Sequence, residues 1–178
     1  MKDKLIYLTG FMGSGKTTIG NILAEKLDYD FIDLDILIEK NEGRTISDIF
    51  KESGEPYFRR LERENLRKVS DSESRIVSLG GGALMNEENQ RFVKSKGVLI
   101  YLKVTPEEIY KRIKGCTDRP LLKKDDKTLF SEDEFINKIS PLFEKREPGY
   151  LTANFVIDTV GKNPEKIAEE IISHINFF

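Results

Sequence analysis

The stretch Gly10-Phe-Met-Gly-Ser-Gly-Lys16-Thr17 constrains the fold of this chain more than any other. It fits the pattern G-x-x-x-x-G-K-[ST] of a phosphate-binding loop. The apolar run Leu5–Leu8 predicts a buried strand before it, and apolar residues at helical spacing from Ile19 to Leu27 predict a helix after it. A glycine turn that fits the pattern by accident is the alternative. Because strand, loop and helix follow one another as the motif requires, the sequence predicts a nucleotide-binding site.

The loop offers several kinds of contact to a polyphosphate. Its glycines let backbone N–H groups turn toward phosphate oxygens, and the helix that begins near Lys16 directs the positive end of its dipole at the same anion. We expect Lys16 to reach the β- and γ-phosphates, Thr17 to bind Mg²⁺ and Thr18 to contact the α-phosphate. The loop residues that we expect to bind the nucleotide are Gly13, Ser14, Gly15, Lys16, Thr17 and Thr18.

The composition excludes several classes of function. The chain has 178 residues and a net charge of −2, so we expect one domain over 1–178 without a general affinity for nucleic acid or an anionic membrane. No apolar stretch is long enough to span a bilayer. With one cysteine, Cys116, and one histidine, His174, neither an internal disulfide, a His/Cys metal cluster nor the usual Ser-His-Asp triad is expected. These features favour a protein of the reducing cytoplasm.

Short apolar runs alternate with helical patterns along the chain. The five candidate strands are Leu5–Leu8, Phe31–Leu34, Ile76–Leu79, Val98–Val104 and Phe155–Ile157. This alternation predicts an α/β fold of three layers, with a parallel sheet covered by helices on both faces. Ligands of such sheets bind beyond the carboxyl ends of the strands. Most of the candidate residues below follow the end of a strand, which supports a site at that edge.

Two carboxylates, Asp33 and Asp35, end the second predicted strand. Because they are two residues apart, they are expected to share one face of the strand, where they would repel each other unless a cation or a hydroxyl ligand engaged them. We expect Asp33 to hold Mg²⁺ through water and Asp35 to accept hydrogen bonds from a substrate hydroxyl. The alternative is a solvated strand end that caps the next helix.

A charged helix is predicted around Tyr57–Glu64, after a short helix that ends at Gly54. Arg59, Glu62 and Arg63 lie on one side of it, at spacings of i, i+3 and i+4. We expect Glu62 to hold Arg59 in place and Arg59 to grip a substrate carboxylate in fork geometry. The alternative is a solvated face with ion pairs within the helix, as most charge runs are.

Two further features are candidates for substrate contacts. Gly80, Gly81 and Gly82 follow the third strand, and glycines there indicate the close approach of a ligand or, alternatively, a tight turn into the next helix. Arg146 is expected one residue before the last position of a helix that Ser131 caps, where it would suit a second contact with an anion. The alternative for Arg146 is a cation that complements the helix C-terminus.

The segment 111–127 is mainly basic and has little apolar content. Lids over phosphoryl-transfer sites have this composition, because closure expels water and brings in positive charge. We expect a lid over about 112–128, with Arg119 as the charge that meets the transferring phosphoryl group. A surface loop without a role in the reaction is the alternative.

Taken together, these segments resemble the shikimate kinase family over essentially the full length of the chain. The resemblance is carried by Gly10–Thr18, Asp33-Leu-Asp35, Phe58-Arg-Arg-Leu-Glu62, Leu79–Gly82, Arg119–Leu122, Arg146 before Tyr150, and Ile157–Thr159 followed by Pro164. Many ATPases and kinases share the phosphate loop, but the combination in this order is specific. The resemblance implies a nucleoside-monophosphate-kinase-like fold with a five-stranded parallel sheet of order 2-3-1-4-5. It also implies transfer of the ATP γ-phosphate to the 3-hydroxyl of shikimate, on the route to chorismate and the aromatic amino acids.

The resemblance further implies roles for single residues. The positions similar to shikimate contacts are Asp35, Arg59, Gly81 and Arg146, within a substrate-binding helical region of about 36–70 and beyond it. Arg119 resembles the lid arginine that reaches the phosphates, and Arg112 resembles a residue that stacks on adenine. Lys162 lies in a loop that resembles the adenine loop, where some relatives carry arginine. The expected catalytic residues are Lys16, Asp35 and Arg119, with Thr17 and Asp33 for Mg²⁺.

Three alternatives compete with this interpretation. A related kinase of another small polyol acid, such as gluconate, would share the loop and the sheet. A GTP-driven switch would need a guanine-reading Asn-Lys-x-Asp sequence, but Asn137-Lys138 lacks the aspartate and lies within a predicted helix. A non-catalytic nucleotide-binding module would be favoured by the loss of Lys16 or Thr17, and both are present. We therefore expect a monomeric enzyme that uses ATP, shikimate and Mg²⁺.

Overall fold

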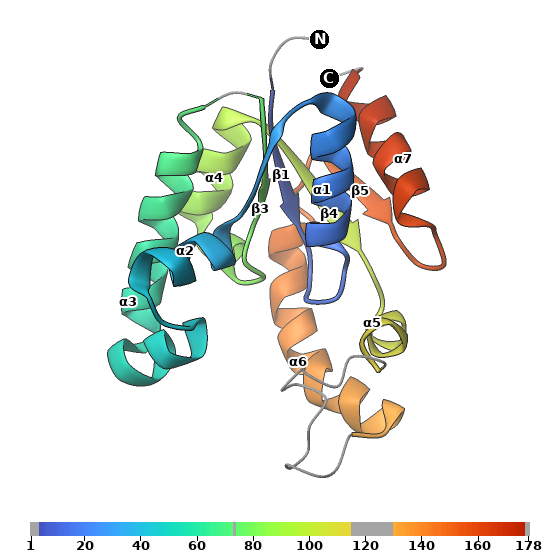
Figure 1. The fold of residues 1–178 in the computed structure, drawn as a ribbon. Helices are drawn as coiled ribbons and strands as arrows, with labels where there is room; N and C mark the ends of the chain where they lie inside the picture. The colour runs from blue at the N-terminus through green and yellow to red at the C-terminus, as the bar shows by residue number, and fades with distance from the viewer. Residues whose placement is uncertain (1–3, 73, 115–129, 177–178) are drawn as a thin grey trace.

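The computed structural model describes residues 4–72, 74–114 and 130–176 (Figure 1). Five parallel strands form one sheet in the order β2-β3-β1-β4-β5, which confirms the predicted fold class. The strands are β1 (Leu5–Thr9), β2 (Asp30–Asp33), β3 (Arg75–Ser78), β4 (Val98–Lys103) and β5 (Phe155–Asp158). Every predicted strand agrees with the observed one to within a single residue at either end.

Helices cover both faces of this sheet and form the outer two layers. They are α1 (Lys16–Leu27), α2 (Leu34–Glu42), α3 (Ile46–Val69), the 3-10 turn η1 (Ala83–Met85), α4 (Glu87–Lys96), α5 (Pro106–Ile113), α6 (Glu132–Tyr150) and α7 (Pro164–Asn176). In Figure 1, α1 and α7 stand side by side over one face, while α3 and α4 lie on the other. The chain therefore forms the three-layer arrangement that the alternation of patterns predicted.

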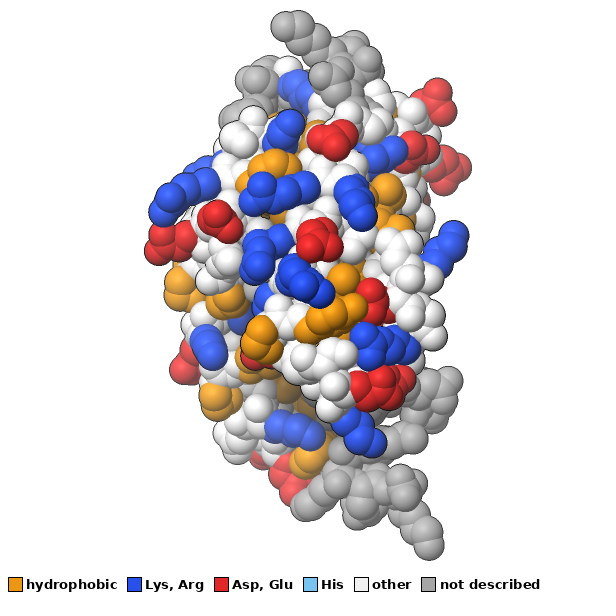
Figure 2. Space-filling model, turned by 90° about the vertical axis from the view of Figure 1, so that its left-hand side faces the viewer, with side chains coloured by type: hydrophobic (Ala, Val, Ile, Leu, Met, Phe, Trp, Pro, Cys, Tyr) orange, Lys and Arg blue, Asp and Glu red, His pale blue; other side chains and the backbone are white. Residues whose placement is uncertain are grey.

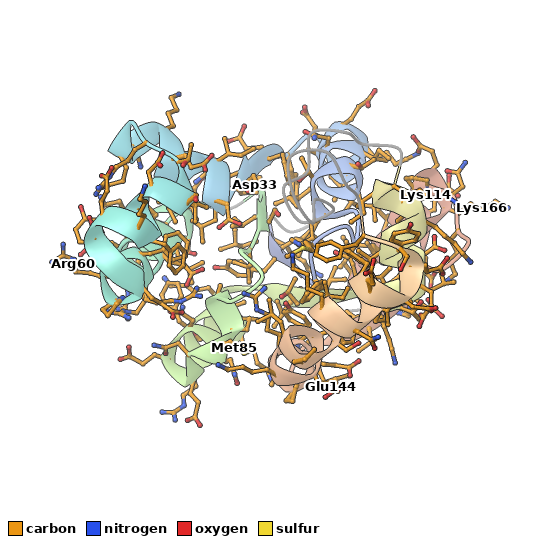
Figure 3. All side chains as sticks on the ribbon, turned by 90° about the horizontal axis from the view of Figure 1, so that it is seen from below. Asp33, Arg60, Met85, Lys114, Glu144 and Lys166 are labelled. Carbon is orange, nitrogen blue, oxygen red and sulfur yellow. The ribbon has the colours of Figure 1, made fainter. Side chains whose placement is uncertain are left out.

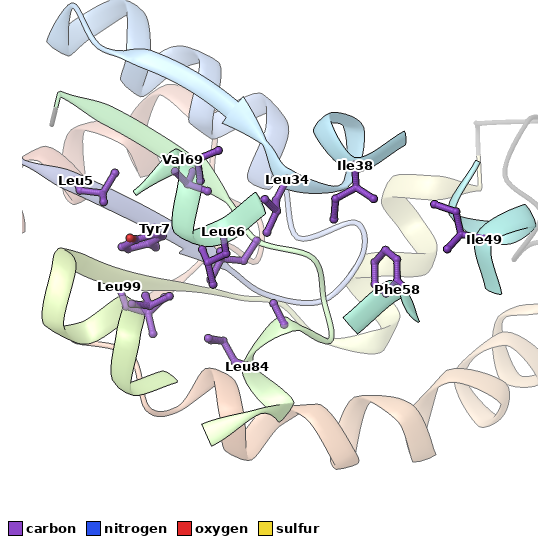
Figure 4. Packing of buried hydrophobic residues seen from close by; sticks show 14 residues of the cluster. Leu5, Tyr7, Leu34, Ile38, Ile49, Phe58, Leu66, Val69, Leu84 and Leu99 are labelled. Atoms are coloured by element: carbon purple, nitrogen blue, oxygen red, sulfur yellow. The ribbon is translucent and has the colours of Figure 1, made fainter. Parts of the chain in front are cut away.

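Strand β1 explains how one run of apolar residues builds two cores. Successive side chains of a strand point to opposite faces, so Leu5 and Tyr7 join the cluster under α3 and α4, while Ile6 and Leu8 join the cluster under α1 and α7. Figure 4 shows the first cluster, in which Leu66 of α3 packs toward the strands. Each fully buried Leu or Ile contributes roughly 1.5–3 kcal/mol through its removal from water. The sheet is therefore held rigidly from both sides.

A third cluster lies beyond the carboxyl ends of the strands and supports the phosphate loop. It joins loop residue Phe11 to the helices α5 and α6, and the Phe11 and Phe143 rings are 5.3 Å apart. Its buried members are Phe11, Tyr101, Val104, Ile109, Ile113, Phe135, Ile139, Phe143 and Tyr150. This packing fixes α5 and α6 against the edge of the sheet where ligands of such folds bind.

Of two predicted helix ends, one is confirmed and one is wrong. Gly54 ends the first helical stretch of α3, as predicted: its backbone is not helical (φ 80°, ψ 166°), and a second helical stretch follows at once. Helix α6 continues through Pro148 to Tyr150 instead of ending at Glu147. Proline removes one backbone donor, but the last turn remains because Gly149 and Tyr150 are buried against neighbouring elements. Tertiary packing here outweighs the local helix-ending signal.

The surface of the α3 and α4 side carries charges of both signs. Figure 2 shows Lys and Arg side chains gathered there, with Asp and Glu side chains among them. Two of the pairs are Arg60 with Glu64 and Arg91 with Glu87, each four residues apart along one helix. Among the residues described, no helix has both the length and the apolar character needed to cross a membrane.

Candidate active site

The phosphate loop leaves β1 and enters α1 with its backbone in conformations that glycine favours. Gly13 and Gly15 have φ angles of 76° and 96°, and Gly15 is the N-cap of α1. A side chain would strain the backbone at both positions, so the pattern of glycines in the sequence is explained by the turn itself. The loop therefore presents bare backbone and a helix N-terminus to the space beside it, which is the arrangement that binds phosphate groups.

Lys16 lies folded along the same loop. Its Nζ donates hydrogen bonds to the carbonyl oxygens of Gly10 and Phe11, at 2.9 and 3.2 Å. Burial lowers the pKa of Lys16 to about 8, although the nearby Asp35 and Asp33 carboxylates oppose the shift. A phosphate group placed here would raise that pKa again and keep the ammonium charged.

A cavity of about 540 Å³ extends from the loop toward α5 and α7. Arg112 of α5 forms part of its wall and donates from Nη1 to the carbonyl oxygens of Gly13 and Ser14, each at 3.3 Å, and from Nη2 to that of Thr159. Arg112 thus ties the phosphate loop to the segment after β5. Lys162 also lines the cavity, but its Nζ is paired with Glu170 of α7 at 2.7 Å.

The two aspartates are arranged differently from the prediction. They do not share a strand face, because β2 ends at Asp33 and Asp35 already belongs to the first turn of α2. Asp33 is the N-cap of α2, and its Oδ1 accepts from the N–H groups of Asp35 and Ile36. Its other oxygen, Oδ2, accepts from the Thr17 hydroxyl at 3.1 Å. The helix cap that was the alternative for Asp33 is therefore confirmed, while its second oxygen faces the phosphate loop and the predicted contact with Mg²⁺ stays a prediction.

Asp35 lies at the junction of two cavities and has an unusual environment. Burial, together with the neighbouring Asp33 charge, raises the pKa of the Asp35 carboxyl to about 6, and Lys16 opposes the shift. The bare backbone of Gly80 makes room for it, since a Cβ at Gly80 would lie 2.6 Å from Asp35 Oδ1. The carboxylate is thus held close to the ammonium of Lys16 in a partly dry site.

A second cavity, of about 210 Å³, lies between α3, α6 and the glycines after β3. Arg59 and Arg146 enter it from opposite helices. Arg59 is fixed by Glu62 at 2.8 Å and by Glu55 at 3.1 Å, which confirms the predicted pairing with Glu62. Arg146 lies over the Phe11 ring, 5.7 Å from its centroid. Two guanidinium groups that face one small cavity suit an organic acid.

The glycine run after β3 makes room for these charged groups. A Cβ at Gly82 would lie 2.5 Å from Arg59 Nη2, and a Cβ at Gly81 would lie 3.0 Å from Arg146 Nη1. The prediction offered a close ligand or a tight turn as the reason for the glycines. The close packing of the Arg59 and Arg146 guanidinium groups against these glycines is a third reason. The glycine backbone also forms part of the wall of the second cavity.

The two cavities adjoin each other. Met12, Lys16 and Asp35 line both of them. Figure 3 looks onto the carboxyl ends of the strands, where Asp33 lies between the α3 side and the side formed by α5 and α6. A group bound at the phosphate loop can therefore meet a small acid bound between the two arginines, with Lys16 and Asp35 at the meeting point.

The other residues singled out in the sequence lie in different places. Arg119, Cys116 and most of the predicted lid lie outside the described residues. Thr18 is exposed and lines the first cavity beside Thr17. His174 is partly exposed, as expected, and stacks on the Phe155 ring at the amino end of β5, away from both cavities.

Sequence reasoning missed two residues at the site. Ser78, the last residue of β3, pairs with Asp33 in the sheet register, and its buried Oγ has no hydrogen-bond partner within the described residues. Tyr150 donates from Oη to the carbonyl oxygen of Gly81 at 2.6 Å. A serine at the end of a strand is a weak signal for a functional residue, and Tyr150 was expected to lie beyond the end of its helix. The place of both residues at the site is recognised only from their neighbours in the folded structure.

Comparison with known proteins shows the family of this chain and supports its fold. The family model described as shikimate kinase matches residues 12–176. A shikimate kinase from Chlorobium limicola is 46% identical over 175 residues, which cover 96% of this chain and 88% of the relative. The crystal structure of a shikimate kinase from Bacteroides thetaiotaomicron superimposes with a TM-score of 0.88 at 33% identity, covering 97% of this chain and 98% of that one. A structure from Acinetobacter baumannii, solved in complex with shikimate, gives a TM-score of 0.85 at 33% identity and covers 99% of this chain and 94% of that one.

Proposed function

The chain belongs to the shikimate kinase family, and from that premise we propose how its two cavities divide the reaction. The enzyme is an ATP-dependent kinase that transfers the γ-phosphate of ATP to the 3-hydroxyl of shikimate, a step in aromatic amino acid biosynthesis. ATP occupies the larger cavity and shikimate the smaller one. The observation that supports this assignment is the junction itself, where Lys16 and Asp35 line both cavities.

In the larger cavity, the proposed contacts to ATP come mainly from the phosphate loop and from α5. The backbone of the loop and the N-terminus of α1 face the phosphates, and Lys16 offsets the charge of the β- and γ-phosphates. Arg112 and Lys162 line the far end of the cavity, where the base would lie. The residues proposed to bind ATP are Gly13, Ser14, Gly15, Lys16, Thr17, Thr18, Arg112, Lys162 and, outside the described residues, Arg119.

The acid half has the chemistry that shikimate requires. Shikimate carries one carboxylate and several hydroxyls, and the smaller cavity has guanidinium groups at Arg59 and Arg146 and a carboxylate at Asp35. We assign the substrate carboxylate to the two arginines and the hydroxyls to Asp35. Gly81 contributes backbone that a side chain would block.

The residues around the loop fit a magnesium ion. Mg²⁺ prefers oxygen ligands and keeps several waters, and it is usually bound through one or two protein oxygens together with substrate phosphates. Thr17 Oγ1 and Asp33 Oδ2 lie 3.1 Å apart beside the loop, and the buried Ser78 Oγ is unpartnered among the described residues. In that same part of the chain, no group of three or more His, Cys, Asp or Glu residues forms a protein-only metal cage. When bound, Mg²⁺ would neutralise phosphate charge; we assign it to Thr17 directly and to Asp33 through water.

The residues of the chain then perform three tasks. Asp35 accepts a hydrogen bond from the attacking hydroxyl, fixes its direction and is placed to take its proton. Lys16 stabilises negative charge on the transferring group, a role that we extend to Arg119. The arginines hold the acid so that the hydroxyl meets the phosphate in line, and much of the rate gain in such transfers comes from this positioning.

The organisation of the chain follows from these assignments. We propose one domain over 1–178, with the phosphate loop at 10–18, a substrate-binding helical region at about 36–70 and a lid at about 112–128. We also propose that the enzyme acts as a monomer. Size-exclusion chromatography with light scattering tests this, and a dimer at working concentration would contradict it. We place the enzyme in the cytoplasm, where its single cysteine would stay reduced.

An assay of ADP release tests the proposed function directly. The purified enzyme with ATP and Mg²⁺ is offered shikimate, gluconate and nucleoside monophosphates in parallel. We expect ADP release with shikimate, and phosphorus NMR should identify a phosphate ester on the 3-hydroxyl. Faster turnover of gluconate or of a nucleotide would overturn the assignment of the smaller cavity while leaving the nucleotide cavity intact.

A further inference from the structure

A hydrogen bond between two distant parts of the chain lies directly behind the proposed acid site. The Tyr150 hydroxyl, at the end of α6, donates to the carbonyl oxygen of Gly81 at 2.6 Å. We infer that Tyr150 is a positioning residue for the acid substrate, because it joins the Gly81 peptide and Arg146 into one fixed unit. This inference rests on the proposed function, since it gives that unit the task of holding shikimate.

Arg146 belongs to the same unit by geometry. A Cβ built at Gly81 would lie 3.0 Å from Arg146 Nη1 and 3.4 Å from Tyr150 Oη, so both polar groups flank one glycine. Burial raises the pKa of Tyr150 to about 12, and the adjacent Arg146 only reduces the shift. The hydroxyl therefore keeps its proton at neutral pH and remains a donor to Gly81.

The end of α6 is locked in place beside this hydrogen bond. Gly149 packs so closely that a Cβ there would lie 2.8 Å from the Leu84 carbonyl oxygen and 2.5 Å from the end of the Met85 side chain. The Tyr150 ring is fully buried and lies 5.2 Å from the Tyr101 ring. Helix α6 and the segment after β3 therefore pack as one body. Within it, the Tyr150 hydroxyl fixes the direction of the Gly81 carbonyl.

The direction matters because a peptide unit is planar. Once the Gly81 carbonyl points to Tyr150, the N–H of Gly82 in the same plane must point the opposite way. Within the described part of the chain, no hydrogen bond occupies the N–H groups of Gly81 or Gly82, although both residues line the smaller cavity. Tyr150 thus sets the angle at which this stretch of backbone meets a bound acid, and at the same time limits the movement of Arg146.

Tyr101 provides a matched control. Its ring is as deeply buried as that of Tyr150 and packs against it, but its hydroxyl has no partner among the described residues. Changing either tyrosine to phenylalanine removes one oxygen and keeps the ring. Only Tyr150→Phe removes a hydrogen bond to the glycine backbone, so a difference between the variants reports on that bond.

The test compares Tyr150→Phe and Tyr101→Phe by steady-state kinetics and by calorimetry of shikimate binding. We expect Tyr150→Phe to raise the KM and Kd for shikimate by about five- to fiftyfold, because the Gly81 peptide loses the hydrogen bond that orients it toward the acid. The KM for ATP should stay within about twofold of wild type, and Tyr101→Phe should change neither constant by more than that. The catalytic constant kcat should fall less than kcat/KM for shikimate.

Three results would overturn the inference. They are an unchanged KM for shikimate in Tyr150→Phe, an equal rise for both substrates, or the same change in Tyr101→Phe. The melting temperature of each variant is measured alongside, because general loosening would affect both substrates together. Failure of the proposed function is separate, since it would appear as poor turnover of shikimate by the wild-type enzyme.

Discussion

Arg59 Nη1 donates to Glu62 Oε2 over 2.8 Å, and the Glu62 side chain is only 1% exposed. Its other oxygen, Oε1, is buried and unpartnered among the described residues. Burial raises the pKa of Glu62, and the Arg59 charge opposes that shift. A carboxylate taken out of water is costly unless it is paired. The unfavourable burial of the Glu62 carboxylate is explained if its function is to hold the Arg59 guanidinium in a single orientation.

Glu62→Gln should therefore weaken acid binding more than it changes the fold. The amide keeps the shape and one hydrogen bond, but it loses the charge that fixes Arg59. We expect the KM for shikimate to rise about tenfold or more, with the KM for ATP little changed. Glu55→Gln is the control, because Glu55 is also paired with Arg59 but is 63% exposed, and its loss should cost less than about threefold. Equal effects of the two changes would refute this role for Glu62.

Gly82→Ala should displace Arg59 without touching the nucleotide cavity. The new Cβ would lie 2.5 Å from Arg59 Nη2, too close for the present rotamer. Because Gly82 has a φ of −107°, alanine causes no backbone strain there, and the effect should come from the clash alone. We expect shikimate affinity to fall by about tenfold or more while ADP affinity measured by calorimetry stays the same. Retained shikimate affinity would mean that Arg59 can hold the acid from another position.

Asp35→Asn should abolish most turnover while ATP binding persists. An amide can still contact a hydroxyl, but it cannot take a proton and it no longer faces Lys16 as a charge. We expect kcat to fall by about a hundredfold or more, the usual scale for a lost general base or orienting group. Equilibrium binding of ADP checks the nucleotide cavity. Turnover close to wild type would remove Asp35 from the reaction.

The same variant should be more stable than wild type, and only above acidic pH. In the folded protein the pKa of Asp35 rises from 3.8 to about 6, so folding disfavours its charged form. This destabilisation of the folded state is absent below about pH 4, where Asp35 is protonated in both the folded and the unfolded chain. It grows between about pH 4 and pH 6, where Asp35 is ionised mainly in the unfolded chain, and reaches its full size above about pH 6. Two pKa units correspond to at most about 3 kcal/mol. Denaturant unfolding of Asp35→Asn should show this gain near pH 8 and none near pH 4; a gain that does not depend on pH would point to another cause.

Ser78→Ala tests the third oxygen near the proposed magnesium site. Removing a buried, unpartnered hydroxyl should leave the melting temperature unchanged or slightly raised. If Ser78 contacts a water of the bound ion, the affinity of the enzyme–ADP complex for Mn²⁺, measured by electron paramagnetic resonance, should fall by about three- to tenfold. Thr9→Ala is the control, because Thr9 also has a buried hydroxyl without a partner in the described structure but does not line the cavity. Unchanged Mn²⁺ affinity in Ser78→Ala would exclude that contact.

Local patterns predicted most of the fold because the signals agreed with one another. Apolar runs predicted the strands, and the glycines of the loop predicted the turn from β1 into α1. The pairing of Arg59 with Glu62 followed from helical spacing. In these cases the partners are neighbours in the chain, so sequence order alone brings them together.

The remaining features depend on contacts between distant segments. The start of α2 at Leu34 was missed because the apolar Leu34 was assigned to the strand, whereas Asp33 both ends β2 and caps the helix that follows. Residues such as Ser78 and Tyr150 carry no local motif, and their importance comes from the neighbours that the fold supplies. The extension of α6 through Pro148 likewise depends on packing against Leu84, more than sixty residues away in the chain.

The three residues shared by the two cavities, Met12, Lys16 and Asp35, also indicate how this enzyme could be inhibited. A single compound in which a short tether joins an adenosine polyphosphate to a shikimate-like ring could occupy both cavities at once. After one half is bound, the other would face its own cavity at an effective concentration set by the tether, which strengthens binding without any new contact. Selectivity would come from the ring, because Arg59 and Arg146 distinguish this acid site from the nucleotide sites of other phosphate-loop enzymes.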